Sequence, residues 1–393
     1  MNRRWQKILT LSFTTVITLF LPGCWDYHRI NDRAQVIGIA VDAVPKQPQL
    51  IQYTFQVPLF SDPESRGKVG GIRAGEGGKQ PSATNASSDK FRNFTEVAPT
   101  LMQAITHAQM HYDRNFYFNN LESVILSEKL KTSTIEKVLA ALMRSGNIDK
   151  MAFVAFSREP AKDILAVEAS SPPADVMERT LGGNLKQTAY VARTRLWEYW
   201  RDFVSIGVDP HAPTVKVDPD GNMMFSGLYA VNRGKQSVNL TPEETMMFNL
   251  INNQIKNASL WVNYGGQPFE LSFMRGSGRF FVTNVPSSHP VLHIRATVRA
   301  QLAQDPSWGL ENVSQKELYQ DEWRASQQMD EEIRTTIEKL KNKDLDILGF
   351  GQQVSVLHPR LKSYIEHDWG RAYKQAQIDV KVRMLINYKG SLM

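Results

Sequence analysis

Cys24 is the only cysteine in the chain of 393 residues, and its thiol is the most reactive group that the sequence offers. Without a second cysteine, an intrachain disulfide and a CxxC zinc site are excluded. The preceding residues indicate what the thiol does. Residues 1–7 carry three cations and no acid, and residues 8–21 carry no charge. This order is typical of a secretory signal peptide, which we place at residues 1–23.

The residues around Cys24 match a bacterial lipobox, with Leu21 at position −3, Gly23 at −1 and the cysteine at +1. A small residue before the cysteine lets the signal peptidase approach, and the thiol accepts a diacylglycerol through a thioether. We therefore predict that Cys24 is lipidated. Pro22 is less usual at position −2 than Ala, Ser or Thr. A retained transmembrane anchor is the alternative, but residues 8–21 fall short of the roughly 20 apolar residues that span a bilayer.

Other arrangements that resemble chemical sites are incomplete. His107 and His111 are four residues apart, but Ala108 stands where a zinc metalloprotease needs glutamate. Residues 71–80 resemble a phosphate-binding loop, but Gln80 occupies the position of the Ser or Thr that binds Mg²⁺. The sequence holds no GxSxG elbow of a hydrolase. We predict no catalytic residue, no metal site, no cofactor and hence no enzyme.

Two further clusters are interpreted as structural. The carboxylates at residues 330–332 are predicted to lie on the solvated side of a long helix. Trp197, Tyr199, Trp200 and Phe203 have helical spacing, which favours packing in a core. Contact of these aromatic residues with a partner or a lipid surface is the alternative.

Charge and composition exclude nucleic acid as the partner. The formal net charge is +6, and removal of the three cations of the signal leaves 43 − 40 = +3. No stripe of Lys and Arg interleaved with aromatic residues appears, so the sequence lacks the pattern of a nucleic-acid-binding surface. With 42% hydrophobic residues, the mature chain of about 370 residues is typical of a globular protein with two or three domains.

Residues 24–209 are predicted to form an N-terminal α/β domain. Residues 36–41 are continuously apolar, as in a buried strand, and residues 51–57 alternate, as in a strand with one solvated face. Residues 61–90 are rich in Gly, Ser and Pro, which predicts a flexible loop. The remaining pattern predicts helices over 94–110, 134–144, 160–167, 174–181 and 195–203, and strands over 116–118, 123–126 and 151–156.

Residues 210–290 are predicted to be a middle, mostly β domain, and residues 291–393 a C-terminal α+β domain. The middle part has short strand patterns at 227–231, 260–264, 269–274 and 279–282, and one helix that starts at the capping box Thr241–Glu244. The last part has a long strand over 292–302, a closing strand over 378–388, and a helix over 322–343 with an inner stripe of Met329, Ile333, Ile337 and Leu340. The predicted fold class is α+β, multi-domain, with mixed or antiparallel sheets and helices packed on one face.

Three segments resemble one family, the Ger(x)C spore germination lipoproteins. They are CWDYHRINDRAQVIGIAVD at residues 24–42, LYAVNRGKQSVNLTPEETMMFNLI at 228–251, and DILGFGQQVSVLHPRLKSYIEHDWGRAYKQAQIDVKVRMLINYKGS at 346–391. The third is the most specific, with Leu-Gly-Phe-Gly, then Trp, then an alternating strand. Met246–Phe248 depart from the residues common in the second segment.

The resemblance implies the C subunit of a nutrient germinant receptor. It implies a lipid anchor on the outer face of the inner spore membrane and two integral membrane partners, an A and a B subunit. It implies a non-enzymatic role in assembly, stability or positioning, while binding of a small-molecule ligand by this subunit stays open. The alternative function is a solute-binding lipoprotein that captures the germinant in a cleft between domains. A third, an anchored cell-wall hydrolase, lacks a pair of acids that points to it.

Overall fold

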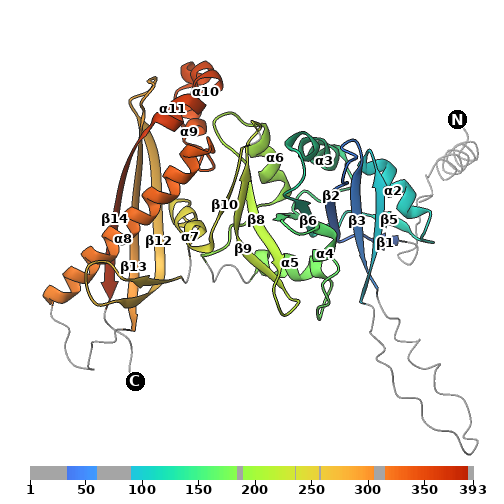
Figure 1. Ribbon diagram of the computed structural model, residues 1–393, viewed down its shortest axis with the longest axis horizontal. Helices are drawn as coiled ribbons and strands as arrows, with labels where there is room; N and C mark the ends of the chain where they lie inside the picture. Colours follow the sequence, from blue (N-terminus) through green and yellow to red (C-terminus); the bar gives the residue numbers. More distant parts are fainter. Residues whose placement is uncertain are drawn as a thin grey trace, which may run out of the picture.

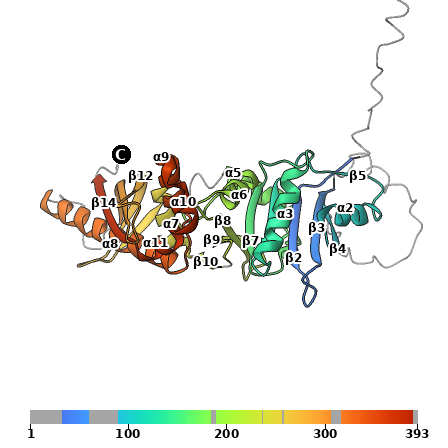
Figure 2. The same ribbon diagram turned by 90° about the horizontal axis from the view of Figure 1, so that it is seen from above.

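The computed structural model describes residues 33–59, 90–183, 189–234, 236–255, 258–304 and 315–387. Two β-sheets with their helices follow one another along the long axis of an elongated molecule (Figures 1 and 2). The predicted signal peptide at 1–23 lies outside the described residues, and so does nearly all of the predicted loop at 61–90.

The N-terminal domain contains an eight-stranded mixed sheet. Its strand order is β10-β9-β8-β7-β6-β2-β3-β4, and the neighbours β8, β7, β6 and β2 are parallel. A separate parallel pair consists of β1 (Arg33–Gln35) and β5 (Asn115–Tyr117). The strands of the large sheet are β2 (Gly38–Ala43), β3 (Ile51–Pro58), β4 (Phe91–Ala98), β6 (Ser123–Ser127), β7 (Phe153–Ser157), β8 (His211–Val217), β9 (Met223–Val231) and β10 (Ser237–Leu240).

Helices cover both faces of this sheet. One core contains β-strand residues together with side chains of α2 (Leu101–Gln109), α3 (Thr132–Arg144) and α6 (Leu196–Val204). A second core, on the other face, contains side chains of α4 (Ala161–Ile164) and α5 (Pro173–Gly182). Val154 and Phe156 of β7 belong to the first core and Phe153 and Ala155 to the second, as alternation along a strand requires.

The C-terminal domain is a four-stranded sheet with helices on one face, which confirms that part of the predicted fold. The strand order is β11-β12-β13-β14, and only β13 and β14 are parallel. The elements are α7 (Pro242–Ile251), β11 (Ser259–Val262), β12 (Phe269–Thr283), β13 (Val291–Gln304), α8 (Gln315–Asn342), α9 (Phe350–Leu357), η4 (Pro359–Leu361), α10 (Lys362–His367), α11 (Trp369–Gln375) and β14 (Gln377–Asn387). The strands of the predicted middle segment at 210–290 thus divide between the two sheets.

The long helix α8 bonds to both edges of this sheet through its side chains. At the β14 edge, Glu322, Ser326 and Asp330 accept hydrogen bonds from the backbone N–H groups of Ile386 (2.9 Å), Met384 (3.0 Å) and Val382 (2.6 Å). At the β11 edge, Gln328 donates to the carbonyl of Trp261 at 2.9 Å and accepts from Asn263 N at 2.9 Å. The predicted inner stripe of the helix is buried between these two rows. Asp330 is therefore a structural acceptor, and the prediction that it only faces solvent is wrong.

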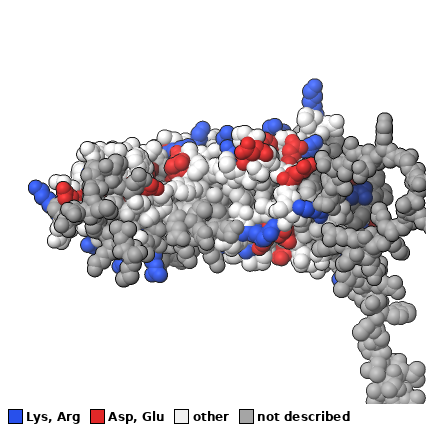
Figure 3. Space-filling model, turned by 90° about the horizontal axis from the view of Figure 1, so that it is seen from below, with Lys and Arg blue, Asp and Glu red and all other residues white. Residues whose placement is uncertain are grey.

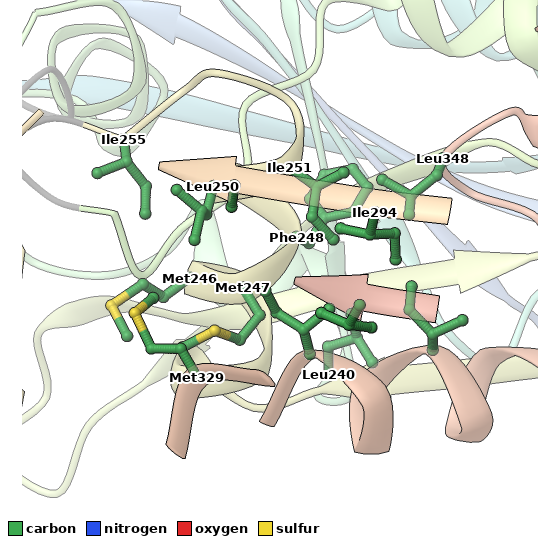
Figure 4. Close-up of a cluster of buried hydrophobic side chains, with 14 of the residues drawn as sticks. Leu240, Met246, Met247, Phe248, Leu250, Ile251, Ile255, Ile294, Met329 and Leu348 are labelled. Atoms are coloured by element: carbon green, nitrogen blue, oxygen red, sulfur yellow. The ribbon is translucent and has the colours of Figure 1, made fainter. Parts of the chain in front are cut away.

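A continuous apolar core joins the two sheets through α7. The predicted capping box is confirmed: Thr241 Oγ1 accepts from Glu244 N at 3.2 Å, and Glu244 Oε2 accepts from Thr241 N at 2.8 Å. The helix buries Met246, Met247 and Phe248 between two groups of side chains. These are Leu228, Ala230, Val238 and Leu240 of the N-terminal sheet, and Ile294, Met329 and others of the C-terminal domain (Figure 4). The two domains therefore share one core.

Two predicted elements are wrong in detail. Residues 94–110 are not one helix: β4 ends at Ala98, and α2 starts at Leu101 after Thr100, whose side chain accepts from Gln103 N. The residues of β4 form eight cross-strand pairs with β3, and this pairing makes them a strand although their apolar residues have helical spacing. The solvated face predicted for β3 is also wrong, because α4 and α5 cover it. Gln56 is fully buried there and bonds to Leu165 O at 2.7 Å and Ala174 N at 3.0 Å.

Candidate functional site: the joint between the two domains

The predicted lipidation site, Cys24, and the predicted lipobox residues, Leu21 and Gly23, lie outside the described residues. Among the described residues, no helix is both long enough and apolar enough to cross a membrane. His107 lies in α2, whereas His111 follows the end of that helix and approaches Glu96 at 3.6 Å. Within the described part of the chain, no three His, Asp or Glu side chains are placed to hold a metal ion.

Asp346 is the first residue of Asp346-Ile-Leu-Gly-Phe-Gly351, a segment of the family resemblance, and its side chain fixes the backbone of this segment through hydrogen bonds. Its carboxylate is fully enclosed and accepts four hydrogen bonds. Oδ1 accepts from Gly349 N at 2.9 Å and Phe350 N at 3.0 Å. Oδ2 accepts from Gly351 N at 2.8 Å and from the Trp369 indole at 2.9 Å. One side chain thus satisfies the first N–H groups of α9 and ties that helix to α11.

The glycines of this segment permit very close backbone packing. A Cβ on Gly351 would lie 2.5 Å from Nε1 of Trp369, so only glycine fits beneath the indole ring. Gly207, which precedes β8 in the N-terminal domain, has a φ of +71°, and a Cβ there would lie 2.5 Å from the carbonyl carbon of Gly351. The backbone of the N-terminal domain is therefore in direct contact with the backbone of the C-terminal domain.

Hydrogen bonds link the two domains at the same place. Asp209 Oδ2 accepts from Asp346 N at 2.7 Å, and Asp209 N donates to Asp346 O at 3.0 Å. Gln352 N donates to Gly207 O at 2.7 Å. The side chain of Asn232, just after β9, donates to Asp344 O at 2.8 Å. We call these segments, residues 205–210 and 232–234 with 344–352 and 365–373, the joint.

Burial makes the carboxylates of Asp209 and Asp346 hard to ionise. Burial raises the pKa of Asp209 to about 7, helped by the nearby charges of Asp346 and Asp344 and opposed by a hydrogen bond from the Asp346 backbone. Burial also raises the pKa of Asp346 to about 6, although its four hydrogen-bond donors favour the ionised form. No ion pair between described residues includes either carboxylate. On the face shown in Figure 3, by contrast, basic and acidic side chains are interspersed.

A cavity of about 330 Å³ opens at the joint. It is lined by residues that include Asp209, Asp344, Asp346, Trp369 and Tyr373, and Asn232 and Arg233 also contribute. This size is at the lower end of small-molecule sites. Carboxylates beside aromatic rings can attract a small cationic group, which is a binding chemistry rather than a covalent one.

The comparisons with known proteins agree from one end of the chain to the other. Residues 26–217 match the family described as "Spore germination protein N-terminal domain", and residues 226–390 match "Spore germination B3/ GerAC like, C-terminal". The chain belongs to the GerAC family of spore germination proteins. The resemblance seen in the sequence is thereby confirmed.

Relatives of the GerAC family align over nearly their whole length. YfkR of Bacillus subtilis (strain 168) is 23% identical over 96% of this chain and 95% of its own. Spore germination protein KC of the same organism is 22% identical over 98% of this chain and 96% of its own. The crystal structure of the GerBC protein matches with a TM-score of 0.56 and 16% identity, covering 89% of this chain and 96% of that one. This match shows the same mixed α+β fold with N-terminal and C-terminal domains.

The sequence identified one half of the joint and missed the other. The segment Asp346–Gly351 and Trp369 belong to the GerAC resemblance, but their structural role was not predicted. Gly207 and Asp209 were missed. Gly207 stands between Ile206 and Val208, and a glycine among apolar residues is a signal of close backbone approach. Asn232 lies in the second segment of the resemblance, at 228–251, but its role at the joint was not predicted.

Proposed function

We propose that this GerAC-family chain is the lipid-anchored, non-enzymatic C subunit of a nutrient germinant receptor. Cys24 carries the lipid and holds the protein on the outer face of the inner spore membrane. A diacylglycerol supplies two acyl chains, which anchor stably, whereas a single chain gives only marginal binding. The partners are the two integral membrane subunits, A and B. Full-length matches to spore germination proteins support this proposal.

The observation that carries the proposal is the rigid connection of the two domains. One core passes through α7, and the joint adds backbone contact and reciprocal hydrogen bonds on a second side. Such a molecule presents distant surfaces in a fixed orientation. A subunit that binds only the assembled form of its partners stabilises that form by mass action. This suits a supporting subunit better than an enzyme.

Crosslinking with mass spectrometry on spore membranes tests the proposal. The wild type is expected to crosslink to two integral membrane proteins, and Cys24→Ala is expected to lose both the membrane attachment and the crosslinks. Thr18→Ala, in the same segment but outside the lipobox, is the matched control and keeps them. A wild-type protein that is membrane-bound but crosslinks to no integral membrane protein would contradict the proposal.

Direct capture of the germinant is the second candidate function, because the cavity at the joint lies between two domains. The proposal predicts that calorimetry with the whole mature chain detects no tight binding of nutrient amino acids or sugars. Tight binding that Asp209→Asn weakens would instead assign solute capture to this subunit. Asp220→Asn, at an exposed position in the β8–β9 turn, is the control.

A further inference from the structure

The end of the C-terminal domain formed by residues 284–290 and 356–362, which we call the apolar tip, exposes large apolar side chains. Val356 is 70% exposed and Leu357 is 65% exposed, at the end of α9. The β12–β13 turn lies beside them, and α9 and α10 stand at the upper edge of the molecule in Figure 1. These two adjacent side chains form an exposed apolar patch, and such patches can mark an interaction site.

The apolar tip contains a groove whose two sides are connected by hydrogen bonds. The groove has a volume of about 480 Å³ and is lined by Val285, Pro286, Leu357, His358, Pro359, Arg360 and Leu361. Its two sides are tied together, since Tyr364 OH donates to Ser287 O at 2.5 Å and Gln353 donates to Phe280 O at 3.0 Å. Leu361 and Val285 also pack against the shared core. The exposed side chains are therefore held in place by the domain.

The charges at the apolar tip have one sign. Residues 347–365 contain no Asp or Glu, and neither do residues 283–290. Arg360 and Lys362 are both exposed, and neither takes part in an ion pair between described residues. Apolar side chains flanked by unpaired cations are typical of surfaces that lie in the interface of an anionic bilayer.

We propose that the apolar tip binds the surface of an anionic phospholipid bilayer. Val356 and Leu357 enter the boundary between headgroups and acyl chains, and Arg360 and Lys362 contact lipid phosphates. The inference rests on the proposed function only in that a lipid on Cys24 brings the protein to a membrane. Because the core and the joint hold the domains rigidly, a lipid before β1 and a contact at the apolar tip would fix the orientation of the long axis.

Vesicle co-sedimentation tests this inference without any receptor subunit. The whole mature chain carries Cys24→Ser so that no lipid is attached. It is expected to bind phosphatidylglycerol vesicles and not phosphatidylcholine vesicles, with affinity that falls as salt rises. Val356→Asp with Leu357→Asp is expected to weaken binding at least tenfold, and Arg360→Ser with Lys362→Ser to weaken it and flatten the salt dependence. Because all four side chains are exposed, unchanged thermal unfolding is expected to show that the variants fold.

Met102→Asp with Met110→Asp is the matched control. These side chains are 65% and 74% exposed, and they belong to the N-terminal domain. The control is expected to bind like the wild type. Absence of wild-type binding to phosphatidylglycerol vesicles, or equal loss in the control, would overturn the inference. So would variants at the apolar tip that bind vesicles normally but lose crosslinks to an integral membrane protein, since the occupant would then be protein. The crosslinks of the wild type test the proposed function separately.

Discussion

At the scale of single residues, two aspartates of the joint, Asp346 and Asp209, are predicted to respond oppositely to the same substitution. Both oxygens of Asp346 accept two hydrogen bonds each. Asp346→Asn replaces one oxygen by an NH₂ group that faces N–H donors, so two donors lose their acceptor. We expect destabilisation of about 2–4 kcal/mol, measured by chemical unfolding at pH 7.5. An unchanged unfolding midpoint would show that the four hydrogen bonds contribute little.

Asp209→Asn is predicted to stabilise the protein at alkaline pH. The amide oxygen can still accept from Asp346 N, while the charge is removed. Because the pKa of Asp209 is raised to about 7 in the folded chain from a usual 3.8, the folded state binds more protons than the unfolded state between these values. The stability that this carboxyl contributes is therefore fully present below about pH 4 and is lost as the pH rises through 7.

The expected result is a difference in the free energy of unfolding between the Asp209→Asn variant and the wild type that depends on pH. The two proteins are expected to unfold alike near pH 4, and at pH 8 the variant is expected to be more stable by up to about 4 kcal/mol. Thermal unfolding across this range measures it. Asp220→Asn, at an exposed position, serves as the control. A constant difference at all pH values would contradict the raised pKa.

At the scale of elements, the close approach at Gly207 can be separated from its backbone conformation. Gly207 and Gly221 both have positive φ, +71° and +83°, but a Cβ on Gly221 meets nothing within 4 Å. Gly221→Ala is expected to cost only the conformational strain, about 1–2 kcal/mol. Gly207→Ala is expected to cost at least about 2 kcal/mol more, because the domains must separate. If thermal unfolding shows the same loss of stability in both variants, the joint accommodates a Cβ at residue 207 at little cost.

The bonds from α8 to the edge of β14 are predicted to protect that strand from exchange with solvent. Asp330→Ala removes the acceptor of Val382 N, so hydrogen exchange is expected to accelerate in peptides covering Gln377–Asn387. Glu331→Ala, one residue along and exposed, is the control and is expected to leave exchange unchanged. Equal exchange in both variants would assign the protection to the apolar stripe alone.

What the sequence predicted depends on whether the deciding interactions are local. The α8 stripe, the capping box at Thr241 and the alternation of β13 and β14 follow from neighbours three, four or two residues apart, and they were found. The division of residues 94–110 into β4 and α2 depends on pairing with β3, about 40 residues away, and it was missed. The contact between the two halves of the joint was missed for the same reason, since Asp209 and Asp346 are 137 residues apart.

At the scale of the whole molecule, the two ranges that match the family, residues 26–217 and 226–390, do not correspond to two separately folded domains. The boundary between residues 217 and 226 covers the turn between β8 and β9 and the first residues of β9, and these two strands are paired neighbours in one sheet. Strands β9 and β10 then contribute side chains to the core that α7 shares with the C-terminal sheet. A surface that must be held fixed relative to a lipid anchor gains from this arrangement, because the two domains share one apolar core.

This continuity predicts that the two domains unfold together. Phe248 is 1% exposed and lies in the shared core, so Phe248→Ala is expected to cost about 3–5 kcal/mol. If the domains form one cooperative unit, hydrogen exchange should accelerate by the same factor in peptides of β7, in the N-terminal sheet, and of β13, in the C-terminal sheet. Leu357→Ala, at an exposed position, should accelerate neither. Acceleration confined to β13 would mean that the N-terminal sheet folds independently, and that α7 connects the domains without coupling their stabilities.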